Sequence, residues 1–192
     1  MCDMKLRFVP NVPNILTLIR LLAIPVLAYL IKAGDAYNLV AFIVFLAIWL
    51  TDMLDGYVAR RFNQMTEFGK LFDPLVDKLY QVTTALMMYL VGKLPLWVLL
   101  FVFVRELLMI IGSFILFKKT DFVVFSKWYG KVATLLFVAA FAALFFLNRS
   151  QAWLSGYIFI LPIAWSFYAY LRYGLQYVAI TREKKRQTSP KG

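Results

Sequence analysis

Six long apolar stretches follow one another along this chain of 192 residues, and they limit what it can fold into. A bilayer core about 30 Å thick needs roughly 20 mostly apolar residues per helix, and a helix satisfies its own backbone hydrogen bonds in lipid. The stretches cover residues 15–31, 37–57, 71–91, 94–117, 132–147 and 153–171. The composition agrees, with 62% hydrophobic residues and a mean hydropathy of +0.74. The sequence therefore predicts an all-α, polytopic membrane protein with six transmembrane helices.

The positions of Lys and Arg predict the orientation of these helices. Six helices place both termini on one side of the membrane, and cytoplasmic loops carry the excess of positive charge. Sixteen Lys and Arg then lie on the side of the termini. The opposite side has only Lys32, Lys93 and Arg149, while Arg20 and Arg105 fall inside apolar stretches. We therefore expect both termini in the cytoplasm.

The remaining composition narrows the class of protein. We expect one transmembrane domain over residues 1–180 and a basic, mobile cytoplasmic tail over residues 181–192. The net charge of +11, in so apolar a chain, favours anionic lipid as a partner and not nucleic acid. There is no His and the one cysteine is Cys2, so any metal must be held by oxygen ligands. The size and the lack of a recognisable targeting peptide favour a bacterial cell membrane.

Four carboxylates lie at the cytoplasmic edge of the second and third stretches. Asp52 and Asp55 are three residues apart and Asp73 and Asp77 are four apart, so each pair shares one face of a helix. A short connection between antiparallel helices would bring the pairs together. Because clustered carboxylates at membrane depth are costly, we expect two Mg²⁺ or Mn²⁺ ions to offset their charge. Two such ions can clamp a diphosphate, which indicates phosphoryl-group chemistry at this active site.

The order of these residues resembles a known signature. It reads Asp52-x-x-Asp55-Gly56-x-x-Ala59-Arg60, eight residues, then Gly69-x-x-x-Asp73-x-x-x-Asp77. This is similar to the signature of the CDP-alcohol phosphotransferase (CDP-alcohol phosphatidyltransferase) family. The resemblance extends to Pro13-Asn14-x-Leu16-Thr17-x-x-Arg20 and to the six-helix layout. It implies a CDP-diacylglycerol-dependent phosphatidyltransferase of phospholipid biosynthesis, which releases CMP and forms a homodimer.

The resemblance also implies roles for single residues. Asp52, Asp55 and Asp73 would be metal ligands, and Asp77 would complete the metal site and act as the catalytic base toward the acceptor hydroxyl. The CDP-lipid would lie against Gly56, Ala59, Arg60, Thr66, Gly69, Asn14, Thr17 and Arg20. For the first helix an alternative stays open, in which Asn14 caps the helix and Arg20 is an interfacial arginine paired with an aspartate.

A basic group further along the chain is the candidate acceptor site. Arg105 could bind an acceptor phosphate and Glu106 could orient it, although adjacent helical residues point about 100° apart. Lys127 and Lys131 would bind an anionic headgroup. Alternatively, they are only solvated basic residues at the cytoplasmic end of the fifth stretch, as the positive-inside rule predicts.

The acceptor itself is left with alternatives. Residues 13–25, Asp73-Pro74 and Asp77-Lys78 are most similar to phosphatidylglycerophosphate synthases, which implies glycerol 3-phosphate as acceptor. Ser113 and Ala133 stand where those enzymes usually have Arg and Lys, and this favours a cardiolipin synthase that uses phosphatidylglycerol. Outside this family, the carboxylates could form a structural ion-pair network or the gate of a metal-ion transporter.

Overall fold

The computed structural model describes residues 11–61, 67–119 and 128–188, with side chains described at all of these except 13, 55–60, 67–71, 110–119 and 173–188. The elements are α1 (Val12–Ala33), η1 (Asp35–Tyr37), α2 (Asn38–Arg61), α3 (Glu67–Leu90), α4 (Leu96–Lys119), α5 (Trp128–Leu144), η2 (Arg149–Gln151) and α6 (Ala152–Thr188). No strand occurs in these ranges, so the all-α prediction is confirmed. Each of the six α-helices overlaps one of the six apolar stretches.

The six helices differ in how well they suit a membrane. Among the described residues, three segments are long and apolar enough to cross one: Asn14–Ala33, Asp35–Leu54 and Arg149–Arg172. α5 is apolar but shorter. These segments indicate an integral membrane protein, while a crossing by all six helices stays a prediction.

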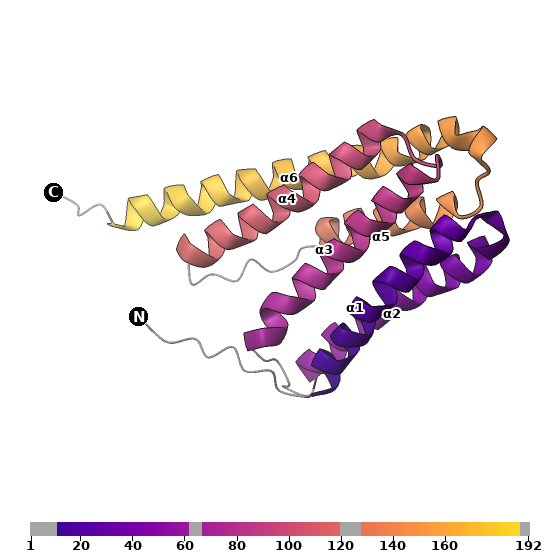
Figure 1. Cartoon of the computed structure of the whole chain (residues 1–192). Coiled ribbons are helices and arrows are strands. Elements are labelled where there is room, and N and C mark those ends of the chain that lie inside the picture. Colours follow the sequence, from indigo (N-terminus) through magenta and orange to yellow (C-terminus); the bar gives the residue numbers. More distant parts are fainter. Residues whose placement is uncertain (1–10, 62–66, 120–127, 189–192) are drawn as a thin grey trace.

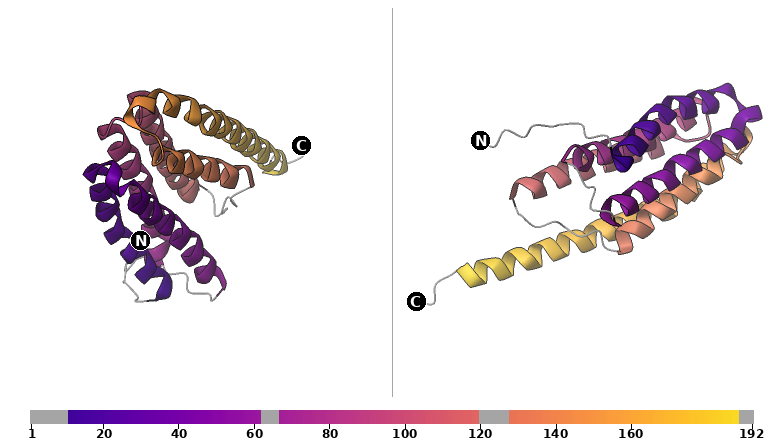
Figure 2. Two further views of the ribbon diagram at one scale, coloured as in Figure 1. Left: turned by 90° about the vertical axis from the view of Figure 1, so that its right-hand side faces the viewer. Right: turned by 90° about the horizontal axis from the view of Figure 1, so that it is seen from below.

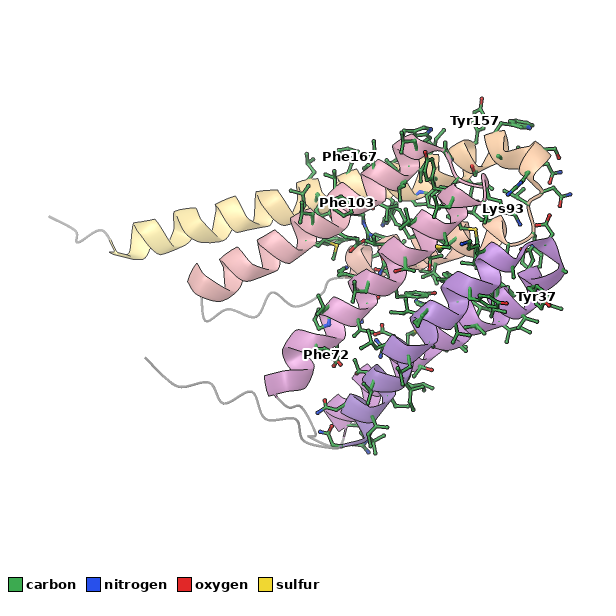
Figure 3. The ribbon with its side chains drawn as sticks, viewed as in Figure 1. Tyr37, Phe72, Lys93, Phe103, Tyr157 and Phe167 are labelled. Carbon is green, nitrogen blue, oxygen red and sulfur yellow. The ribbon has the colours of Figure 1, made fainter. Side chains whose placement is uncertain are left out.

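Polarity is distributed as expected for a protein surrounded by lipid. Leu22 is 64% exposed and Phe167 65% exposed, whereas Arg20 and Glu106 are each only 2% exposed. In Figure 3, Phe103 and Phe167 lie on the outer surface of α4 and α6. Apolar side chains thus cover the outside and charged ones lie between helices, where they find partners.

The start of α1 is set by a local hydrogen bond. Asn11 has an extended backbone and its side-chain oxygen accepts from the Asn14 backbone N–H at 3.2 Å, which is the usual geometry of a helix N-cap. Pro13 lies in the first turn, where its missing N–H costs nothing. The N-cap of α1 is therefore Asn11. The alternative for the first helix, in which Asn14 caps it, is wrong on this point.

Helices that follow one another in the chain run in opposite directions (Figure 1). α1 packs on α2 and α3, α3 packs on α4, and α5 packs on α6. The α1–α2, α3–α4 and α5–α6 connections lie at one end of the bundle (Figure 1). α6 lies on the opposite side from α1 and α2, as the end-on view in Figure 2 also shows. Leu27, Phe45, Met88 and Phe137 belong to the buried core.

α6 is longer than its apolar stretch. It continues to Thr188 and crosses residue 180 without a break, so much of the expected mobile tail is helical. Residues 182–187 are Arg, Glu, Lys, Lys, Arg and Gln, which all favour helix, and the first Pro after them is Pro190. The change from apolar to basic residues near residue 180 thus does not end the helix. The division of the chain into a transmembrane domain and a cytoplasmic tail stays a prediction.

Candidate active site

Two buried side chains of α1 hold two of the signature carboxylates. Thr17 and Arg20 are three residues apart, so they share one face of α1, and they are 1% and 2% exposed. The Arg20 guanidinium donates to Oδ1 of Asp52 on α2 and forms an ion pair with it. The Thr17 hydroxyl donates to Oδ1 of Asp73 on α3 at 2.5 Å. α1 therefore draws one carboxylate from each pair toward the same place.

Asp77 lies one turn after Asp73 on α3 and has different partners. The side-chain amide nitrogen of Gln81, four residues later, lies 3.1 and 3.2 Å from its two carboxylate oxygens and donates to them. The Lys78 ammonium is 3.6 Å from Oδ2. With 28% of its side chain exposed, Asp77 is held in orientation and still accessible.

A buried ion network connects α3 to α4 behind Asp77. The Lys78 ammonium lies 2.5 Å from Oε2 of Glu106, and the Arg105 guanidinium donates to Oε1 of the same carboxylate. Arg105 also donates to the Gln81 side-chain oxygen at 3.4 Å and lies 4.2 Å above the ring centre of Phe137 on α5. Arg105 is thus linked to Asp77 through Gln81. Although they are adjacent in sequence, Arg105 and Glu106 act as one unit because their long side chains reach each other.

The charges of this site come from four helices. Asp73 and Asp77 are close enough for their negative charges to act on Asp52, and Arg20 partly offsets them. In Figure 3, Phe72, which precedes Asp73, marks this region on α3, away from the end that carries Lys93. Three carboxylates of the signature therefore lie in one region of the bundle, near enough to influence one another's charge.

The family assignment follows from comparison with known proteins. Residues 10–168 match the model of the CDP-alcohol phosphatidyltransferase family. The chain belongs to this family. The resemblance drawn from the signature is thereby confirmed, and the protein is a phospholipid-synthesis transferase.

Individual relatives carry two kinds of name. A CDP-diacylglycerol--glycerol-3-phosphate 3-phosphatidyltransferase of Aquifex aeolicus is 37% identical over 127 residues, which cover 65% of this chain and 70% of that protein. One of the same name from Rickettsia felis is 47% identical over 76 residues, 38% of this chain and 41% of that protein. A cardiolipin synthase (CMP-forming) of Streptomyces coelicolor is 30% identical over 183 residues, 92% and 85% of the two chains.

Members of this phosphatidyltransferase family generally depend on divalent metal ions. Asp52 and Asp73 each use only Oδ1 in the hydrogen bonds of the described residues, and an all-oxygen set suits hard cations. Within the described side chains no group of three acidic, His or Cys residues is close enough together to hold an ion. The donor chemistry thus fits Mg²⁺ or Mn²⁺, while the two-ion site with its fourth carboxylate, Asp55, stays a prediction.

Several predicted site residues of this family member lie outside what the structure describes. Thr66 and Lys127 fall in undescribed segments, and the side chains of Asp55, Gly56, Ala59, Arg60 and Gly69 are likewise outside the described set, although they lie on α2 and α3. Asn14 is 3% exposed and lies on the same face of α1 as Thr17. Lys131 is exposed on α5. Their roles remain predictions.

Gln81 is the site residue that the sequence reasoning missed. Its position four residues after Asp77 on a helix was the available signal, because such pairs lie on one face. It was overlooked because a glutamine in an apolar segment carries no charge to draw attention.

Proposed function

We propose that this chain transfers the phosphatidyl group of CDP-diacylglycerol to glycerol 3-phosphate, forming phosphatidylglycerophosphate and CMP. The observation that carries the proposal is that Asp52, Asp73 and Asp77 lie in one region of the bundle and that each accepts a hydrogen bond from a side chain of α1 or α3. Family membership and the Aquifex and Rickettsia relatives support the donor and the acceptor.

Asp77 is the proposed catalytic base. The acceptor hydroxyl oxygen attacks the phosphorus that carries the lipid, the bond from this phosphorus to the CMP phosphate breaks, and CMP leaves with the bridging oxygen. The hydroxyl proton passes to a carboxylate oxygen of Asp77, whose orientation Gln81 fixes. A positioned base typically contributes about 10²- to 10⁴-fold in rate.

The other carboxylates hold the reacting groups in place. Asp52, Asp55 and Asp73, with Asp77, would hold two Mg²⁺ or Mn²⁺ ions, which supply positive charge to the diphosphate and the developing negative charge. Thr17 and Arg20 fix Asp73 and Asp52, so α1 sets the spacing of the carboxylates. Arg105, Lys127 and Lys131 are the proposed contacts of the acceptor phosphate.

The proposed setting is a bacterial cell membrane with all six helices crossing it and both termini in the cytoplasm. The sixteen cations on the side of the termini support this topology. The carboxylates would then open to the cytoplasm, where a water-soluble acceptor is available. A homodimer is part of the proposal, and the mass of the protein–detergent complex measures it.

A cardiolipin synthase is the second candidate, and two observations favour it. The Streptomyces relative of that name aligns with 92% of this chain. The guanidinium of Arg105 is also engaged by Glu106 and Gln81, which leaves less of its charge for a small dianion. An acceptor that is itself a lipid, such as phosphatidylglycerol, needs fewer phosphate ligands.

The test is CMP release by the purified chain in mixed micelles of CDP-diacylglycerol with Mg²⁺ or Mn²⁺. Glycerol 3-phosphate, phosphatidylglycerol, inositol phosphate and serine are compared as acceptors, and mass spectrometry identifies the lipid product. We expect phosphatidylglycerophosphate from glycerol 3-phosphate. Cardiolipin from phosphatidylglycerol alone would favour the second candidate. No CMP with any acceptor would refute both and reopen the metal-ion transporter.

A further inference from the structure

A pocket that contains several charged side chains lies at the end of the bundle opposite the carboxylates. Its volume is about 290 Å³, and its lining comes from the α1–α2 connection, the turn after α3 and η2. These three connections are distant in sequence but lie together at one end of the bundle (Figure 1). We call it the distal pocket. Its size is near the lower end of the range for small-ligand sites, roughly 300–1,000 Å³.

The distal pocket collects positive charge. Lys32, Lys93 and Arg149 line it, together with one carboxylate, Asp35. Asp35 is neutralised locally, because the Lys93 ammonium lies 2.9 Å from its Oδ1 and the Asn38 amide donates to the same oxygen at 2.8 Å. Lys32 and Arg149 therefore leave a net charge of two.

Two of these cations are held in fixed positions with donors to spare. The Lys93 side chain is 4% exposed, and its ammonium forms the ion pair with Asp35 but no hydrogen bond among the described residues. The Arg149 Nε–H donates to the Val91 carbonyl at 2.7 Å, which orients the guanidinium while leaving its terminal nitrogens out of that bond. A structural tie between connections explains the Lys93–Asp35 pair and the Arg149–Val91 hydrogen bond, but it explains neither Lys32 nor the terminal nitrogens of Arg149.

The position of the distal pocket suggests what the charge binds. These are the only three Lys or Arg residues that the predicted topology places on the side opposite the termini, and all three line one pocket. Tyr37 and Tyr157 are 49% and 65% exposed and lie at the same end of the bundle as Lys93 (Figure 3). Exposed Tyr residues are enriched where a protein meets lipid headgroups. Phosphate is the anion that is abundant at this level.

We propose that the distal pocket binds a phosphate group, from a lipid headgroup of the leaflet opposite the carboxylates or from free phosphate. This site is separate from the proposed active site. The choice of leaflet and the argument from the three cations opposite the termini rest on the proposed topology. Lys32 and Arg149 supply the charge, and Lys93 supplies a buried donor.

Thermal unfolding of the full chain in a neutral detergent tests the proposal, with the fluorescence of its five Trp as readout. The probes are dihexanoyl phosphatidic acid and inorganic phosphate, with chloride as the ionic-strength control. At a hundred times Kd, a ligand of the folded state raises Tm by about 5–10 °C for a chain of this size. A rise with the lipid alone assigns the site to a headgroup, and an equal rise with inorganic phosphate assigns it to the free anion.

Variants locate the site. Lys32→Gln and Arg149→Gln should each raise Kd at least tenfold, and the double variant should abolish the rise in Tm. Arg172→Gln removes an exposed cation elsewhere, and Asp52→Asn alters the carboxylate region, so both should keep the rise. Arg149→Gln removes the hydrogen bond to Val91 and could unfold the chain. Lys32→Gln removes no hydrogen bond of the described residues, so it tests the proposal even in that case. No rise with either probe, or a rise unchanged in Lys32→Gln, would overturn the proposal.

Discussion

Gln81→Leu is the variant that best separates the proposed chemistry from the fold. Gln81 donates to both oxygens of Asp77 at 3.1 and 3.2 Å and accepts from Arg105. Leucine has a similar size and removes all three contacts. Asp77 keeps its position on α3 and its 3.6 Å ion pair with Lys78 but loses the hydrogen bonds that fix its orientation, so turnover should fall although substrates still bind.

The size of the loss follows from these hydrogen bonds. A hydrogen bond to a charged group contributes about 1.5–3 kcal/mol. If Asp77 must recover its orientation in each turnover, this corresponds to a fall in kcat of roughly 10- to 150-fold, at 1.36 kcal/mol for each factor of ten. A general base contributes about 10²- to 10⁴-fold in rate. The fall in kcat expected for Gln81→Leu is therefore smaller than, or close to the lower limit of, the fall expected when the base itself is lost.

The assay is CMP release under saturating CDP-diacylglycerol, with kcat and KM for the acceptor measured separately. The matched control is Thr84→Val, one turn further along α3. Thr84 is fully buried, and its hydroxyl donates to the Tyr80 carbonyl of the same helix at 2.8 Å. We expect the control to keep its kcat. An unchanged kcat in Gln81→Leu would refute the orienting role, and so would a rise in KM alone.

Three further predictions concern the carboxylates. Asp77→Asn should reduce CMP release to background while CDP-lipid binding, measured by equilibrium binding, stays within a few fold; an equal loss of binding would make Asp77 mainly a metal ligand. Glu106→Leu leaves Lys78 and Arg105 buried without their shared anion and should destabilise the protein by about 3–5 kcal/mol, seen as a lower Tm; an unchanged Tm would contradict this role. Chelation with EDTA should stop CMP release and added Mg²⁺ or Mn²⁺ should restore it, whereas activity that survives chelation would exclude the two-ion site.

The apolar pattern of the sequence was sufficient to predict the helices but not their ends. It located six of them because long apolar runs separated by polar ones leave few alternatives. The helix ends differ from the ends of the apolar stretches because an apolar stretch shows only which residues suit lipid. Residues such as Arg182 and Lys184 also favour helix in water, so α6 continues through them.

The spacing of the signature predicted part of the site. It placed Asp73 and Asp77 one turn apart on one helix, while the pairing of Asp52 with Asp55 stays a prediction. The fold adds Arg20 and Thr17 of α1 as the groups that hold Asp52 and Asp73. The ion network around Glu106 could not be predicted from the sequence. It depends on how α3 packs on α4, and no local pattern in the sequence indicates that packing.

The contacts of the proposed active site also hold the helices together. Thr17 and Arg20 link α1 to α3 and α2, and the Lys78–Glu106 pair links α3 to α4. In apolar surroundings an unpaired charge is costly, so each of these side chains favours the packing that gives it a partner. The packing of the helices around the carboxylates thus depends on the same polar groups that the proposed chemistry uses. For this reason a substitution that breaks one of these contacts changes stability together with activity. Asp77→Asn and Gln81→Leu keep the size of the side chain and leave these contacts in place, so they can reveal the chemistry alone.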